Sequence, residues 1–143
     1  MRVLSCNSPY GQGGMGQHFA HLVEEARRDG TLDHYYTPDG KDGDPKAQRI
    51  RSRWARWLTR FSPLRAFPGW MTYAHAELYD RAVAAALQTA PECFTGFAGE
   101  SLHSFRRARA LGTERLELVT ATSHVENVAA RHEQALRDAG FGR

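Results

Sequence analysis

The sequence predicts an α/β protein with a Rossmann-like, doubly wound parallel sheet of about four strands. Three observations support this prediction. Short runs of β-forming and apolar residues alternate along the chain with segments of helical period. The first run leads through a glycine-rich turn into a helix. The run over residues 93–98 is apolar enough throughout to be a central strand of a parallel sheet.

The first unit combines a strand and a helix. Residues 2–6 form a short apolar run of strand character. From Phe19 to Ala26, apolar residues recur at i, i+3, i+4 and i+7, which places them on one helix face. Two arginines and Gly30 then close the helix, as last-turn cations and a C-terminal glycine commonly do.

The middle of the chain predicts a strand, a loop and two helices. Residues 32–37 are β-formers bounded by turn residues, and residues 38–45 have almost nothing to bury. Residues 46–61 have a helical period, and residues 72–90 predict a longer helix that Pro91 ends.

The last third predicts two further strand and helix pairs. The strand over 93–98 leads into a helix over 99–111, capped by glycine, and the strand over 116–121 leads into a helix over 125–139. With right-handed crossovers, we expect the four predicted strands to lie in the order 2-1-3-4.

Length and composition fit a single domain over residues 1–143. Hydrophobic residues make up 41% and charged residues 24%, as in ordinary globular proteins, so neither a disordered nor a fibrous class is indicated. The net charge of +3 permits an anionic ligand without requiring one. No run is long enough for a membrane-spanning helix and no signal peptide is evident, so we expect a soluble, cytoplasmic protein. We expect Cys6 and Cys93 to be buried thiols in neighbouring strands.

In doubly wound sheets, ligands bind beyond the carboxyl ends of the strands. The loop over residues 7–18 begins there and has four glycines between positions 11 and 16. At the start of a helix, unpaired amides and the helix dipole favour an anion, so we predict a phosphate-binding turn. The alternative is a turn that needs glycine only for positive φ. Residues 98–101 and 122–124 should converge on the same edge.

Residues 11–16 match the dinucleotide pattern G-x-G-x-x-G. Two features disfavour NAD or FAD. Residues 7–10, with Pro9 among them, lengthen the turn, and the acids nearest the second strand, Asp33 and Asp39, lie at its start and past its end. A dinucleotide-binding oxidoreductase fragment therefore stays as the first alternative.

Several segments together resemble the N-terminal domain of GT-B glycosyltransferases of the family 4 type. The segments are residues 1–4, 8–18, 97–102, 108–112 and 118–124. The resemblance implies transfer of a sugar from a nucleotide-sugar donor to a hydroxyl of a sugar, lipid-linked or other acceptor, with retention. The donor is a substrate, and no cofactor or metal is implied.

The resemblance also implies site residues. Gly13, Gly14 and Gly16 would let the backbone approach the donor diphosphate, and His124 would be the catalytic residue that contacts the transferred sugar or the acceptor hydroxyl. The cleft for acceptor and sugar would include Tyr10, His18 and Glu100. Each has a simpler interpretation as well: for example, an acid at a helix start is stabilised by the helix dipole alone.

A GT-B enzyme holds its nucleotide mainly on a second domain, which carries a paired-glutamate motif. We therefore expect a missing C-terminal domain or a partner chain, and no turnover by this chain alone. The remaining alternative is a non-catalytic interaction module.

Residues 46–65 carry seven cations interleaved with aromatic residues. Tryptophan on one helix face and arginine on the other is typical of a helix at a membrane interface. We expect docking to a membrane, at its inner face, or to a partner. The predicted docking residues are Arg49, Arg53, Trp54, Arg56 and Trp57. The alternative is a helix packed on the domain with solvated arginines. Nucleic acid is disfavoured, because aromatics opposite the cations cannot stack bases in a basic groove.

Overall fold

The computed structural model describes residues 1–51 and 53–120, apart from the side chains of residues 53, 64 and 65. Its elements are β1 (Arg2–Ser5), α1 (Gly13–Arg28), β2 (Leu32–Thr37), β3 (Ala47–Arg49), α2 (Arg53–Phe61), the 3-10 helix η1 (Pro63–Ala66), α3 (Pro68–Ala86), β4 (Cys93–Phe97), α4 (Leu102–Leu111) and β5 (Arg115–Val119). The predicted helix over residues 125–139 lies outside the described residues.

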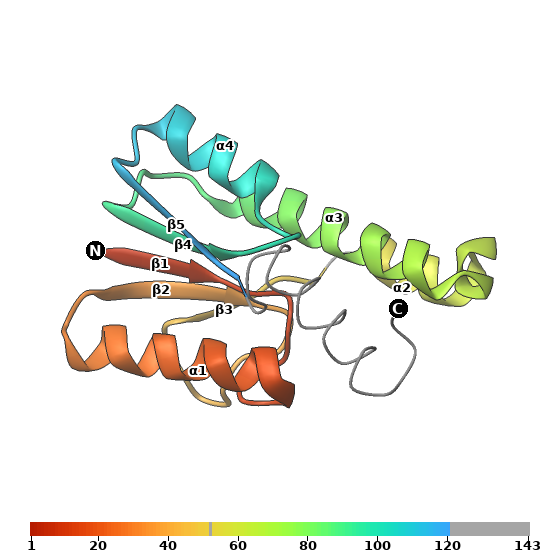
Figure 1. The fold of residues 1–143 in the computed structure, drawn as a ribbon, viewed down its shortest axis with the longest axis horizontal. Helices are drawn as coiled ribbons and strands as arrows, with labels where there is room; N and C mark the ends of the chain where they lie inside the picture. Colours follow the sequence, from red (N-terminus) through yellow and green to blue (C-terminus); the bar gives the residue numbers. More distant parts are fainter. Residues whose placement is uncertain (52, 121–143) are drawn as a thin grey trace, which may run out of the picture.

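The sheet has five parallel strands in the order β3-β2-β1-β4-β5 (Figure 1). This confirms the α/β class. It also confirms the predicted order of the four strands, which are β2, β1, β4 and β5 here. The fifth strand, β3, was not expected. It has only three residues and lies at the edge of the sheet beside β2.

The predicted helix over residues 46–61 was wrong in its first part. Residues 47–49 pair with residues 35–37 as β3, and the helix α2 starts only at Arg53. Pairing with the open edge of β2 satisfies backbone groups, and it outweighs a helical period that has little tertiary packing. Arg49 therefore belongs to β3, where it forms an ion pair with Asp42 at 2.9 Å, and not to the basic aromatic helix.

The loop before β3 is held by one buried carboxylate. Asp44 accepts hydrogen bonds from Arg27 on α1, from the Tyr35 hydroxyl on β2 (2.9 Å) and from the Lys46 amide (3.0 Å). Burial acts to raise the pKa of Asp44, but these hydrogen bonds lower it overall. The charged carboxylate thus joins α1, β2 and the entry to β3.

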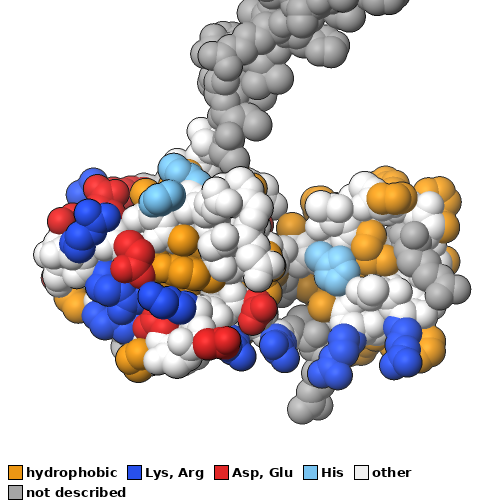
Figure 2. All heavy atoms as spheres, turned by 90° about the horizontal axis from the view of Figure 1, so that it is seen from below, with side chains coloured by type: hydrophobic (Ala, Val, Ile, Leu, Met, Phe, Trp, Pro, Cys, Tyr) orange, Lys and Arg blue, Asp and Glu red, His pale blue; other side chains and the backbone are white. Residues whose placement is uncertain are grey.

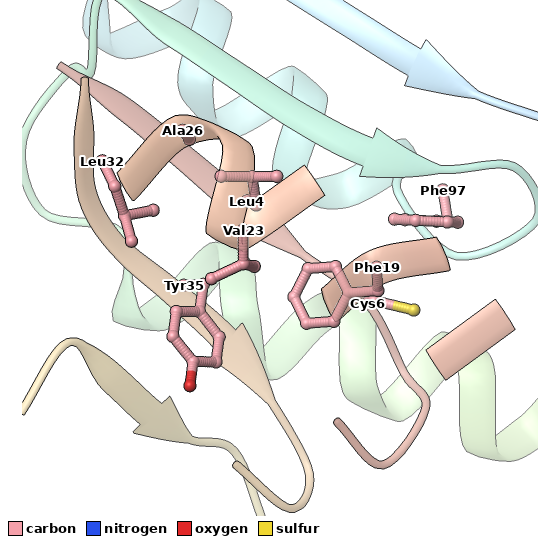
Figure 3. Packing of buried hydrophobic residues seen from close by; sticks show 8 residues of the cluster. All are labelled: Leu4, Cys6, Phe19, Val23, Ala26, Leu32, Tyr35 and Phe97. Atoms are coloured by element: carbon pink, nitrogen blue, oxygen red, sulfur yellow. The ribbon is translucent and has the colours of Figure 1, made fainter. Parts of the chain in front are cut away.

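Helices cover both faces of the sheet (Figure 1). Successive strand residues point to opposite faces, so Leu4 and Tyr35 pack beneath α1 whereas Val3 and Tyr36 pack beneath α3 and α4. Figure 3 shows the first of these two cores. It consists of Leu4, Cys6, Phe19, Val23, Ala26, Leu32, Tyr35 and Phe97. Cys6 and Cys93 are buried free thiols, as predicted.

The remaining boundaries differ modestly from prediction. The helix α3 begins at Pro68, which suits the first turn of a helix, and it ends at Ala86, before Pro91. The helix α4 ends at Leu111 and is capped by Gly112, whose φ of +103° is the left-handed conformation expected of a capping glycine.

The segment from α2 through η1 to the first half of α3 forms a helical hairpin that extends beyond the end of the sheet (Figure 1). The buried residues of α3, Tyr79, Asp80 and Val83, lie in its second half, where it packs against α4 and the sheet. Among the described residues, no helix is long and apolar enough to cross a bilayer.

Candidate functional site

The strands β1 and β4 are neighbours, and from them the chain continues toward opposite edges of the sheet. Ligands of doubly wound proteins bind at such a switch point. Two segments meet there. The amide of Asn7, just after β1, donates to the Glu100 carboxylate just after β4 at 2.7 Å. This contact marks the centre of the candidate site.

The glycine loop uses several of its own amides internally. The amides of Tyr10, Gly11 and Gln12 donate to backbone carbonyls at 2.9, 3.0 and 3.2 Å. Gly11 has a φ of +74°, which a residue with a side chain rarely adopts. This part of the loop is a tight structural turn and does not present amides to a ligand.

The start of α1, by contrast, is open. Gln12 provides no side-chain cap, and the first turn contains no acid. Gly13 and Gly14 are exposed, and a Cβ atom added to either would meet nothing within 4 Å. The positive end of a 16-residue helix therefore faces open space. This is the part of the predicted phosphate-binding turn that remains accessible.

Gly16 lies in a different environment from Gly13 and Gly14. It is buried, and a Cβ atom there would lie 2.3 Å from the backbone oxygen of Pro9. Glycine at this position lets the loop pack against α1. That Gly16 also contacts a phosphate stays a prediction. The structure accounts for glycine at this position by packing alone.

Tyr10 and His18 point to different surroundings. The hydroxyl of Tyr10 donates to Glu24 at 2.8 Å, and its ring packs against Tyr35 in the layer between α1 and the sheet. Burial and the bond to Glu24 raise the pKa of Tyr10 to about 12. His18 is exposed on α1, with its ring 6.2 Å from that of Phe97 at the end of β4. The structure thus brings the His18 side chain beside the exit of β4, whereas the Tyr10 side chain packs against α1 and β2.

Burial shifts the pKa of Glu100, and that of a neighbouring thiol, upward. Burial raises the pKa of Glu100 above its ordinary value, although the Asn7 amide partly offsets this. Burial, and then the charge of Glu100, raise the pKa of Cys6 to about 12. Only the thiolate is a strong nucleophile, and the buried Cys6 thiol packs in the core beneath α1.

Replacement of Glu100 by glutamine is expected to flatten the fall of stability with rising pH. The pKa of Glu100 is raised in the folded state, so its contribution is fully present below its ordinary value of 4.5 and is lost as pH rises through the folded value. The Glu100→Gln variant keeps an acceptor for the Asn7 amide and removes the ionisation. Melting temperatures measured from pH 4.5 upward should decline less in the variant than in the wild type. Parallel curves would contradict the raised pKa.

The N-terminus of α4 does not offer a second anion site. The carboxylate of Asp80, on α3, accepts hydrogen bonds from the amides of His103 (2.6 Å) and Ser104 (2.9 Å). Asp80 is 2% exposed. The helix start that follows β4 is therefore already filled by a residue of the protein itself.

Two cavities flank the contact between Asn7 and Glu100. The larger, of about 560 Å³, lies between α3, α4 and β5 and includes Glu100, Asp80 and Phe105 in its lining. The smaller, of about 360 Å³, lies on the side of Asn7, where the exits of β1, β2 and β3 meet α2 and α3.

We call the smaller cavity the arginine cleft. Its polar lining consists of Asn7, Arg51, Arg56, His75 and the largely buried Tyr79. The imidazole of His75 is within 3.2 Å of the Thr59 hydroxyl. Sequence reasoning missed this cleft. The run of cations was visible, but which of them face the strand exits depends on how the hairpin folds back.

Comparison with protein-family models, curated proteins and solved structures finds no significant match. The resemblance to GT-B glycosyltransferases therefore rests on the residues alone. Among residues 1–51 and 53–120, no three His, Cys, Asp or Glu side chains come together as a metal site requires. His124, the predicted catalytic residue, lies outside the described residues, and the side chain of Arg53 is not described either.

Proposed function

We propose that this chain is the acceptor-side lobe of a glycosyltransferase that uses a nucleotide-sugar donor. One observation carries the proposal: an uncapped helix start and an arginine-lined cleft lie at the carboxyl edge of one doubly wound sheet. Helix starts and arginines both favour phosphate groups. The residues quoted for the GT-B resemblance supply the enzyme class.

The chemistry of sugar transfer fits such an edge. As the bond between the sugar and the diphosphate breaks, negative charge develops on the leaving group and needs fixed positive groups nearby. The amides of Gly13 and Gly14 supply one such group, and Arg51 and Arg56 supply others. In this proposal a second lobe holds most of the nucleotide. His18 and Glu100 lie toward the acceptor side.

A titration followed by amide NMR tests the proposal, because it detects weak binding and locates it. Uridine diphosphate glucose should shift the amide resonances of Gly13 and Gly14. Binding of the diphosphate should be about tenfold weaker in the Gly14→Ala variant, where a methyl group occupies the open first turn. The reason is that one charge-assisted hydrogen bond contributes about 1.5–3 kcal/mol.

The matched control is Gly69→Ala. Gly69 also lies in the first turn of a helix, with nothing within 4 Å of an added Cβ atom, but it belongs to the hairpin. Binding should be unchanged in this variant. Shifts with NADH and none with the sugar nucleotide would support a dinucleotide fold instead. No shift with either would leave a non-catalytic interaction module and overturn the proposal.

A further inference from the structure

The helical hairpin exposes an unusual set of aromatic side chains. Each is between 49% and 69% exposed to solvent. The set consists of Trp54, Trp57, Phe61, Phe67, Trp70 and Tyr73. Large apolar side chains scattered singly over a surface are ordinary, but a contiguous group marks a surface that binds something.

The aromatic residues share one surface across the two helices. Trp54 and Trp57 of α2 meet edge to face, with ring centroids 6.3 Å apart. Together with Trp70 and Tyr73 of α3, they line a groove of about 410 Å³ between α2 and α3. We call this surface, with Phe61 and Phe67, the aromatic face. Trp54 and Trp57 were predicted to dock, and the structure adds Phe61 at the end of α2, Phe67 just before α3, and two residues of α3.

The charged residues of the hairpin are basic, and the acidic residue in the lining of its groove, Glu77, is hydrogen-bonded to Arg81 and His103. Residues 45–76 contain no aspartate or glutamate. Arg56 and Arg60 lie along the side of α2 that faces His75 of α3. Of these two arginines, Arg56 also lines the arginine cleft. In Figure 2 the hairpin appears as the lobe on the right, with hydrophobic and basic side chains and no acidic ones in that view.

We propose that the hairpin docks this protein onto an anionic phospholipid bilayer, with the aromatic face in the interface and the arginines against lipid phosphates. Tryptophan and tyrosine have an apolar ring and a polar edge, which suits the boundary between headgroups and acyl chains. Cations on the adjoining surface suit anionic headgroups. The proposal stands on the hairpin alone and does not depend on sugar transfer.

Charge favours a lipid surface over a second copy of the chain. A symmetric dimer would bring the same surface of each copy together, so the arginines of one hairpin would lie near those of the other. A bilayer that contains anionic lipid instead brings opposite charge to every arginine.

The tryptophans provide a direct measurement. The chain has three, and all of them belong to the aromatic face. Tryptophan emission therefore reports only this surface. Vesicles of phosphatidylcholine with phosphatidylglycerol should shift the emission of residues 1–143 to the blue, and vesicles of phosphatidylcholine alone should shift it much less. Added salt should weaken the response.

Variants separate the apolar and charged contributions. The double variant Trp57→Ala and Trp70→Ala keeps Trp54 as the reporter and should bind mixed vesicles at least about tenfold more weakly. The Arg60→Gln variant, which leaves the arginine cleft intact, should bind about fivefold more weakly. The matched controls are Leu118→Ala and Arg106→Gln, which alter exposed residues outside the hairpin and should bind as the wild type does. Because all these side chains are exposed, none of the changes should unfold the domain.

Three outcomes would overturn the proposal. The first is an unchanged emission spectrum with mixed vesicles, together with no co-sedimentation. The second is equal binding to both kinds of vesicle without salt dependence, which would show that anionic lipid is not required. The third is a blue shift that grows with protein concentration in the absence of vesicles, which would assign the aromatic face to a second copy.

Discussion

Replacement of Gly16 by alanine is expected to lower the free energy of unfolding by about 3 kcal/mol. An added Cβ atom would lie 2.3 Å from the backbone oxygen of Pro9, and neither the loop nor the helix α1 can move aside easily. The loop amide of Gln12 donates to the same carbonyl at 3.2 Å, so the displacement would also disturb the turn. Urea unfolding followed by circular dichroism measures the change.

Gly14 provides the matched control two residues earlier in the same helix. An added Cβ atom there would meet nothing within 4 Å, and its φ is not positive. The Gly14→Ala variant should be as stable as the wild type or more stable by about 0.5–1 kcal/mol, because alanine is the better helix former. Equal losses for the two variants would show that the contact with Pro9 is not the cause.

Replacement of Asp80 by alanine is expected to lower the free energy of unfolding by about 2–3 kcal/mol. The change leaves the amides of His103 and Ser104 without their acceptor at a buried helix start. It also removes a link between α3 and α4, the two helices on this face. Thermal and urea unfolding both measure the loss.

The Asp80→Asn variant should recover part of this loss, since an amide oxygen can accept one of the two hydrogen bonds. Glu25→Ala, at an exposed position of α1, is the control for loss of one acidic side chain and should change stability little. If Asp80→Ala behaved like Glu25→Ala, the capping of α4 by Asp80 would be refuted.

Gly16 and Asp80 also explain why fewer groups are available to a ligand at the candidate site than the sequence suggested. Of the four clustered glycines, Gly16 is used for packing and Gly11 for a turn, which leaves Gly13 and Gly14 at the open start of α1. The helix start after β4 is filled by Asp80. An anion at this edge therefore has the start of α1 and the arginine cleft available to it.

Much of the fold was predictable because the central strands are buried on both faces. The strand β4 is buried along its whole length, and such an apolar run is recognisable without any neighbour. The helix α1 shows its apolar face directly in the spacing of Phe19, Val23 and Ala26, all of which are fully buried. Buried apolar residues leave a periodic signal in the chain itself.

At residues 47–49 the periodic pattern of the chain fails to predict the structure. Gln48 and Arg49 are polar and exposed, Ala47 is half-buried, and all three adopt an extended conformation because β2 offers unpaired backbone groups. The buried carboxylate of Asp44 also positions the loop before them. The strand β2 and the Arg27 side chain that bonds Asp44 are both distant in the sequence, so the local period predicted a helix instead.

The α/β class, the order of four strands, the glycine-rich opening of α1 and the basic aromatic character of the hairpin could all be predicted from the order of residues along the chain. Three features depend on how the elements pack: which glycines lie at the open start of α1, the filling of the start of α4 by Asp80, and the cleft that Arg51, Arg56 and His75 share with Asn7. The packing likewise placed Trp70 and Tyr73 beside Trp54 and Trp57. The physical reason is that burial is encoded by spacing along one element, whereas a site is made from exposed polar and aromatic side chains that different elements bring together.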